Sequence, residues 1–178
     1  TPLAVNNFLF LAKERFYEDI IFHRVVEGFV IQTGDPKGTG SGGPGYSFND
    51  EETDRQYQAY SVGMANAGAN TNGSQFFITV GDISEGNLDA LNSRVYTLFG
   101  QVVNGFAVVD SIGRVEVDGN DKPAGNYYSI ATNSTIANGT TNPTVTVTGV
   151  NFAAGIGAHG AVGQQQTHGA GGGEVINH

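Results

Sequence analysis

Cysteine and tryptophan are both absent from the 178-residue sequence. Without cysteine, disulfide bonds, thiolate catalysis and cysteine-ligated zinc sites are excluded. The sequence also lacks any apolar run near the roughly 18 residues that a membrane-spanning helix needs, so we expect no membrane span. Hydrophobic residues nevertheless make up 39% of the chain, which is enough apolar material for one core.

Basic residues are scarce as well. Eight lysines and arginines stand against seventeen aspartates and glutamates, which gives a formal net charge of -9. Proteins that bind nucleic acid attract its phosphates through clustered basic side chains, and this sequence offers no such cluster. We therefore expect no nucleic-acid partner.

Short apolar and β-branched runs alternate with glycine-rich turns up to Gly113. Thr1 supplies a hydroxyl that can cap a helix and Pro2 is suited to a first helical position, so a helix is predicted to begin there and to run through residues 3–16. A second helix is predicted at 106–113. Strands are predicted at residues 19–26, 29–34, 60–67, 75–80 and 95–102. Many short strands with two helices indicate a closed or nearly closed β-barrel capped by the helices.

The composition changes sharply after Lys122, which is the last basic residue apart from histidine. Alternating threonine and valine predict one strand within residues 142–152, whereas the glycine-rich residues 153–178 are typical of a flexible or partner-ordered tail. We place a boundary near residue 138, between a domain at 1–138 and an extension at 139–178. This cysteine-free extension, rich in glycine, threonine and asparagine, favours an extracytoplasmic location.

Two residue patterns partly match a cofactor or metal site, and neither pattern is complete. The glycines of residues 38–43 and 155–160 fit the spacing of a dinucleotide-binding loop, but neither segment joins a strand to a helix. Three histidines, His159, His168 and His178, lie far apart in the glycine-rich tail and fix no metal geometry. We expect no cofactor and no metal site.

Arg24 stands inside an apolar run that should form a buried strand, and Gln32 stands inside the next one. A buried guanidinium must be paired or must face a polar partner, because desolvating an isolated charge is costly. One interpretation is a structural arginine paired with Asp35 or Glu27 at a barrel rim. The other is an arginine that faces a substrate groove.

Four segments decide between these interpretations: FHRVVEGFVIQTGD (22–35), GTGSGGPGYSFNDE (38–51), MANAGANTNGSQFFI (64–78) and YTLFGQV (96–102). Together they strongly resemble the cyclophilins, which are peptidyl-prolyl cis/trans isomerases built on an eight-stranded barrel. The resemblance covers roughly residues 1–138. It implies a mostly β fold, an antiparallel barrel capped by two helices, and an enzyme that acts on X-Pro bonds of peptides and flexible protein clients to assist folding.

The resemblance also assigns roles to individual residues. Arg24 would be the catalytic arginine and Gln32 its polar neighbour. Either Leu88 or Leu91 would close the proline pocket, because the segment around them differs from the family pattern. Tyr96 falls where animal members usually have histidine. The other implied substrate-binding residues are Phe29, Val30 and Phe77 in the proline pocket, and Ala65, Asn66 and Gln75 along the groove.

The sequence departs from the family in two ways. Cyclophilins usually have a strand hairpin before the Thr-Pro helix, so we expect the first barrel strands to be missing or supplied elsewhere. An open edge invites pairing with another chain, which leaves a second function open: an assembly protein that forms homo-oligomers through its C-terminal strand. The tryptophan that helps the family to bind cyclosporin is also absent, so weakened inhibition is expected.

Overall fold

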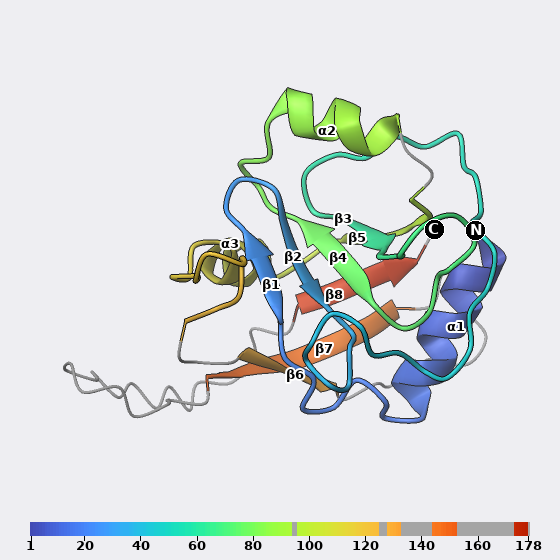
Figure 1. Cartoon of the computed structure of the whole chain (residues 1–178), viewed down its shortest axis with the longest axis horizontal. Coiled ribbons are helices and arrows are strands. Elements are labelled where there is room, and N and C mark those ends of the chain that lie inside the picture. Colours follow the sequence, from blue (N-terminus) through green and yellow to red (C-terminus); the bar gives the residue numbers. More distant parts are fainter. Residues whose placement is uncertain (94–95, 125–127, 133–143, 153–172, 178) are drawn as a thin grey trace.

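The computed structural model describes residues 1–93, 96–124, 128–132, 144–152 and 173–177 (Figure 1). The helices are α1 (Pro2–Lys13), α2 (Glu85–Asn92) and α3 (Phe106–Gly113). The strands are β1 (Arg24–Val26), β2 (Val30–Thr33), β3 (Ser61–Met64), β4 (Phe76–Thr79), β5 (Leu98–Val102), β6 (Tyr128–Thr132), β7 (Thr144–Phe152) and β8 (Gly173–Asn177). No helix among these is long and apolar enough to cross a membrane.

The strands form one antiparallel sheet in the order β1-β2-β4-β3-β5-β8-β7-β6. The mostly β, antiparallel character agrees with the prediction. The closed barrel does not, because no pairing among the described strands joins β1 to β6. The sheet is therefore open, with β1 and β6 as its outer strands.

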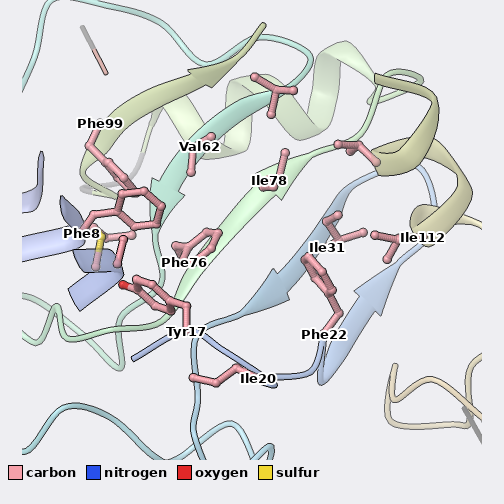
Figure 2. Close-up of a cluster of buried hydrophobic side chains, with 14 of the residues drawn as sticks. Phe8, Tyr17, Ile20, Phe22, Ile31, Val62, Phe76, Ile78, Phe99 and Ile112 are labelled. Atoms are coloured by element: carbon pink, nitrogen blue, oxygen red, sulfur yellow. The ribbon is translucent and has the colours of Figure 1, made fainter. Parts of the chain in front are cut away.

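The core lies between the first five strands and the helices that pack on them. Phe8 of α1 contacts three other aromatic rings, those of Tyr17, Phe76 and Phe99, at centroid distances of 5.3 to 5.4 Å. Figure 2 shows these rings meeting between α1 and the sheet. Aromatic pairs in tilted or edge-to-face geometry stabilise a core beyond the area that they bury. The packing fixes α1 against β4 and β5.

The N-terminus of α1 is capped from a distant part of the chain. Thr1 occupies the N-cap position, but its side chain makes no capping hydrogen bond, so the predicted hydroxyl cap is wrong. Instead the carboxylate of Glu51 accepts hydrogen bonds from the amides of Leu3 (3.0 Å) and Ala4 (2.8 Å). A negative charge at this end also interacts favourably with the helix dipole.

Helix α2 corrects the prediction of two helices. Its N-cap is Ser84, whose hydroxyl accepts a hydrogen bond from the amide of Asn87 at 3.3 Å. Leu91 is its one buried residue, with Leu88 packed nearby. With only these two large apolar residues, the helix lacks the long apolar repeat by which sequence patterns identify helices.

The C-terminal extension contributes two strands to the sheet. β7 lies where the threonine and valine alternation predicted a strand. β8 was not predicted, and it pairs with β5 on one side, placing Val175 opposite Val102, and with β7 on the other. The three tail histidines lie outside the described residues. The boundary near residue 138 stays a prediction.

Candidate active site

A small cavity of about 100 Å³ gathers all but two of the predicted site residues. Its lining residues are Arg24, Phe29, Val30, Gln32, Ala65, Asn66, Phe77, Leu91 and Tyr96. The two exceptions are Gln75 and Leu88, which lie next to it. Residues from three strands, one helix and the segments beside them, distant in the sequence, therefore meet at one place.

The register of the sheet explains how the key side chains come together. Arg24 on β1 is directly opposite Gln32 on β2, Gln32 is opposite Phe77 on β4, and Phe77 is opposite Gly63 on β3. Residues directly opposite in an antiparallel sheet project from the same face. The row therefore runs from a charged group through an amide to an aromatic ring.

The position opposite Phe77 on β3 is Gly63, and there is no room for a side chain at this position. A Cβ atom at this position would overlap the Tyr57 hydroxyl and would lie 2.7 Å from Cζ of Phe77. Any larger residue would push one of these rings away. The absence of a side chain therefore lets the two rings pack over β3, where Phe77 lines the cavity and Tyr57 supports it from behind.

Tyr57 is a supporting residue that sequence reasoning missed. Its ring stacks on Phe77 with centroids 5.8 Å apart and an interplanar angle of 22°, while Tyr96 meets Phe77 edge-on. The Tyr57 hydroxyl donates to the carbonyl of Tyr96 at 3.2 Å, and burial raises its pKa, so it remains a donor. Tyr57 lies in an irregular segment without a strand or helix pattern, which left no signal for its role.

The structure also separates the two candidate leucines. Leu91 is 3% exposed and lines the cavity. Leu88 is partly buried and packs on the same apolar cluster without lining the cavity. Both come from α2, so this helix forms one wall of the site.

Gln75 connects the apolar cavity to the glycine-rich loop at residues 38–43. Its side-chain oxygen accepts a hydrogen bond from Gln32 at 3.0 Å. Its amide nitrogen donates to the carbonyls of Gly40 (3.0 Å) and Gly42 (2.9 Å). Beyond this contact lies a second cavity of about 510 Å³, lined by residues 40–47, 65–67, 71 and 73–75 together with Gln32. Gln75 thus stands between the two cavities.

Asp35 organises that loop from within. Its buried carboxylate accepts hydrogen bonds from the amides of Lys37 (2.7 Å), Thr39 (2.9 Å), Gly40 (2.7 Å) and Gly42 (3.0 Å). Burial alone would raise the pKa of Asp35, but these four donors outweigh it and lower the pKa to about 2. The glycine-rich loop is therefore wrapped around a carboxylate of the protein itself.

Arg24 pairs with a different residue from those expected. Its Nη2 atom lies 3.2 Å from Oδ2 of Asp121, and the two side chains are 40% and 44% exposed. Within the described part of the chain, neither of the predicted partners, Asp35 and Glu27, forms an ion pair with Arg24, and the Asp35 carboxylate is occupied by loop amides. A pair this exposed contributes only about 0 to 1 kcal/mol to stability.

His23, next to Arg24 in the chain, is buried with a side chain that makes no hydrogen bond within the described part of the chain. Burial lowers its pKa and the charge of Arg24 lowers it further, while the carboxylate of Asp35 and the nearby side chain of Gln75 act in the opposite direction. The net shift is downward, so the folded protein holds His23 neutral to lower pH than the unfolded chain does.

This shift predicts a loss of stability at mildly acidic pH. As pH falls below about 6.5, the unfolded chain binds a proton at His23 that the folded protein does not. The contribution of His23 to the free energy of unfolding should therefore be complete above about pH 6.5. Below that pH it should decrease, by at most about 1.4 kcal/mol per pH unit. Chemical denaturation of the wild-type protein and of His23→Gln between pH 7 and 5 measures this. An equal slope in both proteins would show that His23 is not the cause.

Fold and pocket together define a β-sheet protein that can receive a small apolar group beside an arginine side chain. A model of the cyclophilin-type peptidyl-prolyl cis-trans isomerases matches residues 1–134. The chain therefore belongs to the cyclophilin-type peptidyl-prolyl cis-trans isomerase family.

Individual relatives agree with this membership. The chain is 51% identical over 112 residues to peptidyl-prolyl cis-trans isomerase A of Mycobacterium tuberculosis, covering 61% of this chain and 58% of that protein. It is 44% identical over 127 residues to peptidyl-prolyl cis-trans isomerase CYP18-1 of Arabidopsis thaliana, covering 68% and 76%. The chain thus spans less than two thirds of the length of the mycobacterial relative.

A solved structure shows the same fold. It is a cyclophilin-type peptidyl-prolyl cis-trans isomerase from Cryptosporidium parvum, crystallised in the presence of the dipeptide Ala-Pro. The TM-score is 0.62 at 40% sequence identity, over 69% of this chain and 78% of that one.

Proposed function

We propose that this chain catalyses cis/trans isomerisation of X-Pro bonds in peptides and in flexible segments of protein clients. The observation that carries the proposal is the row formed by Arg24, Gln32 and Phe77, which sets a guanidinium at the rim of an apolar cavity. The Cryptosporidium relative crystallised with Ala-Pro present supports a proline-containing ligand.

The chemistry requires a positioned donor and a fixed ring. An X-Pro bond resists rotation because amide resonance imposes a barrier of roughly 18 to 20 kcal/mol. In the twisted state the prolyl nitrogen regains a lone pair, and the Arg24 guanidinium is a charged donor suited to bind it. The proline ring would rest on Phe77, with Leu91 as a side wall, while the preceding peptide turns. No covalent bond is broken.

Asn66 and Ala65 are proposed to hold the substrate backbone at the edge of the pocket. The Asn66 side-chain amide donates to Asp50 (3.2 Å) and lies 3.4 Å from the side-chain oxygen of Asn72. The Ala65 amide donates to the carbonyl of Gln75 at 3.0 Å. These contacts fix the β3 extension, and a fixed backbone can orient a peptide without first being ordered by it.

A proline-peptide isomerisation assay on the wild-type protein tests the proposal. We expect the rate of cis-to-trans conversion to rise in proportion to enzyme concentration. The assay should use a panel of peptides that differ in the residue before the proline. If the folded protein leaves every peptide at its uncatalysed rate, the proposed function is contradicted.

Cyclosporin is expected to inhibit this protein weakly. The family's tryptophan, which contributes to binding that inhibitor, has no counterpart here because the sequence contains none. Titration calorimetry with cyclosporin, and a proline peptide as a positive control for the pocket, measures the affinity. Nanomolar binding of cyclosporin would contradict this prediction.

An assembly role through the C-terminal strands is the second candidate. The observation that favours it is the position of β8, which enters the sheet between β5 and β7 after a long connection. A strand delivered in this way can be exchanged with the same strand of a second copy. Size-exclusion chromatography with light scattering would reveal such a dimer, and a monomer at all accessible concentrations would exclude it.

A further inference from the structure

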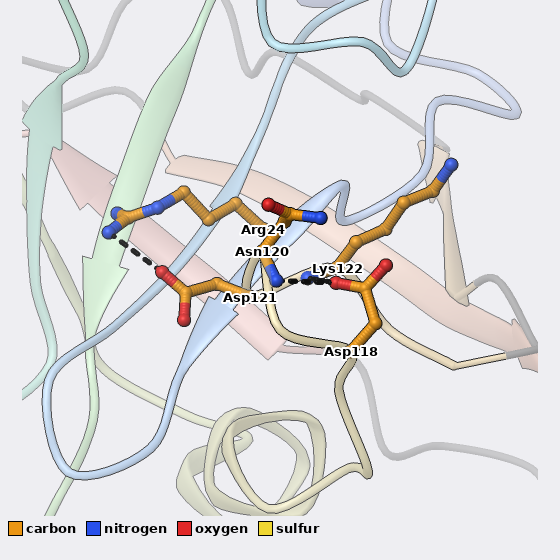
Figure 3. A network of polar contacts seen from close by, with 5 residues as sticks. All are labelled: Arg24, Asp118, Asn120, Asp121 and Lys122. Atoms are coloured by element: carbon orange, nitrogen blue, oxygen red, sulfur yellow. Dashed lines mark hydrogen bonds and ion pairs between the residues drawn. The ribbon is translucent and has the colours of Figure 1, made fainter.

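The Arg24 guanidinium is held by a carboxylate from a remote turn, as Figure 3 shows. Arg24 Nη2 lies 3.2 Å from Oδ2 of Asp121. The backbone carbonyl of Asp121 also accepts a hydrogen bond from the amide of Val25 at 2.8 Å. One residue is thus joined to Arg24 through its side chain and to the next residue of β1 through its backbone.

The turn at residues 118–122 presents this carboxylate in a fixed position. The carboxylate of Asp118 accepts from the amides of Asn120 (2.8 Å) and Lys122 (3.1 Å). The Asp118 amide donates to the carbonyl of Lys122, and the Asp121 amide donates to the carbonyl of Asp118. Asp121 has a φ of 60°, in the left-handed region that residues other than glycine rarely adopt. The protein keeps this unfavourable conformation at the residue that faces Arg24.

Stability alone does not account for the arrangement, because an ion pair this exposed contributes little to folding. Orientation does account for it. A half-exposed arginine has many rotamers, and each must be given up when the guanidinium binds a substrate. We propose that Asp121 is a positioning residue that holds the Arg24 guanidinium in the orientation needed at the proline pocket. This inference rests on the proposed isomerase function.

The proposed role of Asp121 predicts a specific effect on kcat and KM. A guanidinium carries five N–H donors, so binding one carboxylate oxygen at Nη2 leaves others to face the pocket. Since Arg24 is proposed to act on the twisted state, its disorder should affect kcat more than KM. Ordering one such side chain corresponds to a rate factor of about three to ten.

The test compares two replacements of Asp121. Asp121→Gly removes the carboxylate without strain at a positive φ, and we expect kcat to fall about three- to ten-fold with KM changed less than about two-fold. Asp121→Asn keeps an oxygen acceptor and should retain part of the activity. In an Arg24→Ala background, Asp121→Gly should cause no further loss. Asp82→Ala, which removes the exposed ion pair with Arg114 (3.7 Å), is the matched control and should behave as wild type.

Two outcomes would overturn the inference from kinetics: an unchanged kcat in Asp121→Gly, or an equal loss in the Arg24→Ala background. A second measurement does not depend on activity. The NMR order parameter of the Arg24 Nε–Hε bond should fall in Asp121→Gly relative to wild type, and an unchanged value also overturns the inference. An inactive wild-type protein with the expected NMR change would instead contradict only the proposed isomerase function.

Discussion

Replacement of Arg24 by alanine is expected to lower kcat/KM for X-Pro isomerisation by at least about ten-fold. One charge-assisted hydrogen bond contributes about 1.5 to 3 kcal/mol, and each factor of ten in rate corresponds to about 1.4 kcal/mol. The loss should therefore span one to two factors of ten. The fold should persist, because the side chain is 40% exposed and its ion pair with Asp121 contributes little to stability.

Two companion variants sharpen this experiment. Arg24→Lys keeps the charge but lacks the planar donor geometry, so it should also be impaired. Arg114→Ala removes another exposed arginine with a carboxylate partner, one that does not line the cavity, and it should retain full activity. Thermal unfolding of each variant checks the fold. An Arg24→Ala protein with wild-type kcat/KM would refute the proposed mechanism.

Truncation after Asn138 is expected to destabilise the domain or change its oligomeric state. The shortened chain loses β7 and β8, which leaves the β5 edge at Gly100, Gln101 and Val102 without its partner strand. Domains have only about 5 to 15 kcal/mol of net stability, so an exposed edge and the buried area behind it matter. We expect the melting temperature to fall by at least about 5 °C, or light scattering to show association.

A point variant in the complete chain provides the control. Ile176→Pro, opposite Gln101 in the β5–β8 pair, disturbs the ladder without removing the extension. It should reproduce much of the destabilisation. If the truncated protein is a monomer with unchanged melting and full activity, the extension is a passive appendage.

The sequence predicts the elements that carry strong local patterns. Residues 19–34 show two β-branched runs around Gly28, and the structure has the β1–β2 hairpin there. Helix α3 ends at Gly113, as its terminal glycine indicated. Most of the pocket follows from this success, because the sheet register places Arg24, Gln32 and Phe77 in one row once the strands are correct.

The features that sequence reasoning missed depend on contacts between distant residues. Glu51 caps α1, Tyr57 supports Phe77, and Asp121 binds Arg24, yet none of these residues belongs to a periodic pattern that points to its partner. β8 is a five-residue strand after a glycine-rich stretch. It forms because it pairs with β5, and its own composition gives little indication of a strand. Local propensity is a weak guide where tertiary pairing decides the structure.

The connections of Tyr57 have a mechanical consequence for the pocket. Its ring lies against Phe77, its hydroxyl donates to the carbonyl of Tyr96, and its backbone amide donates to the side chain of Asn92 at the end of α2. Tyr57 thereby links α2, which carries Leu91, to Phe77, so a displacement of α2 would be transmitted to the Phe77 ring. We therefore expect a pocket of nearly fixed shape, which would accept one small ring and adapt poorly to larger groups.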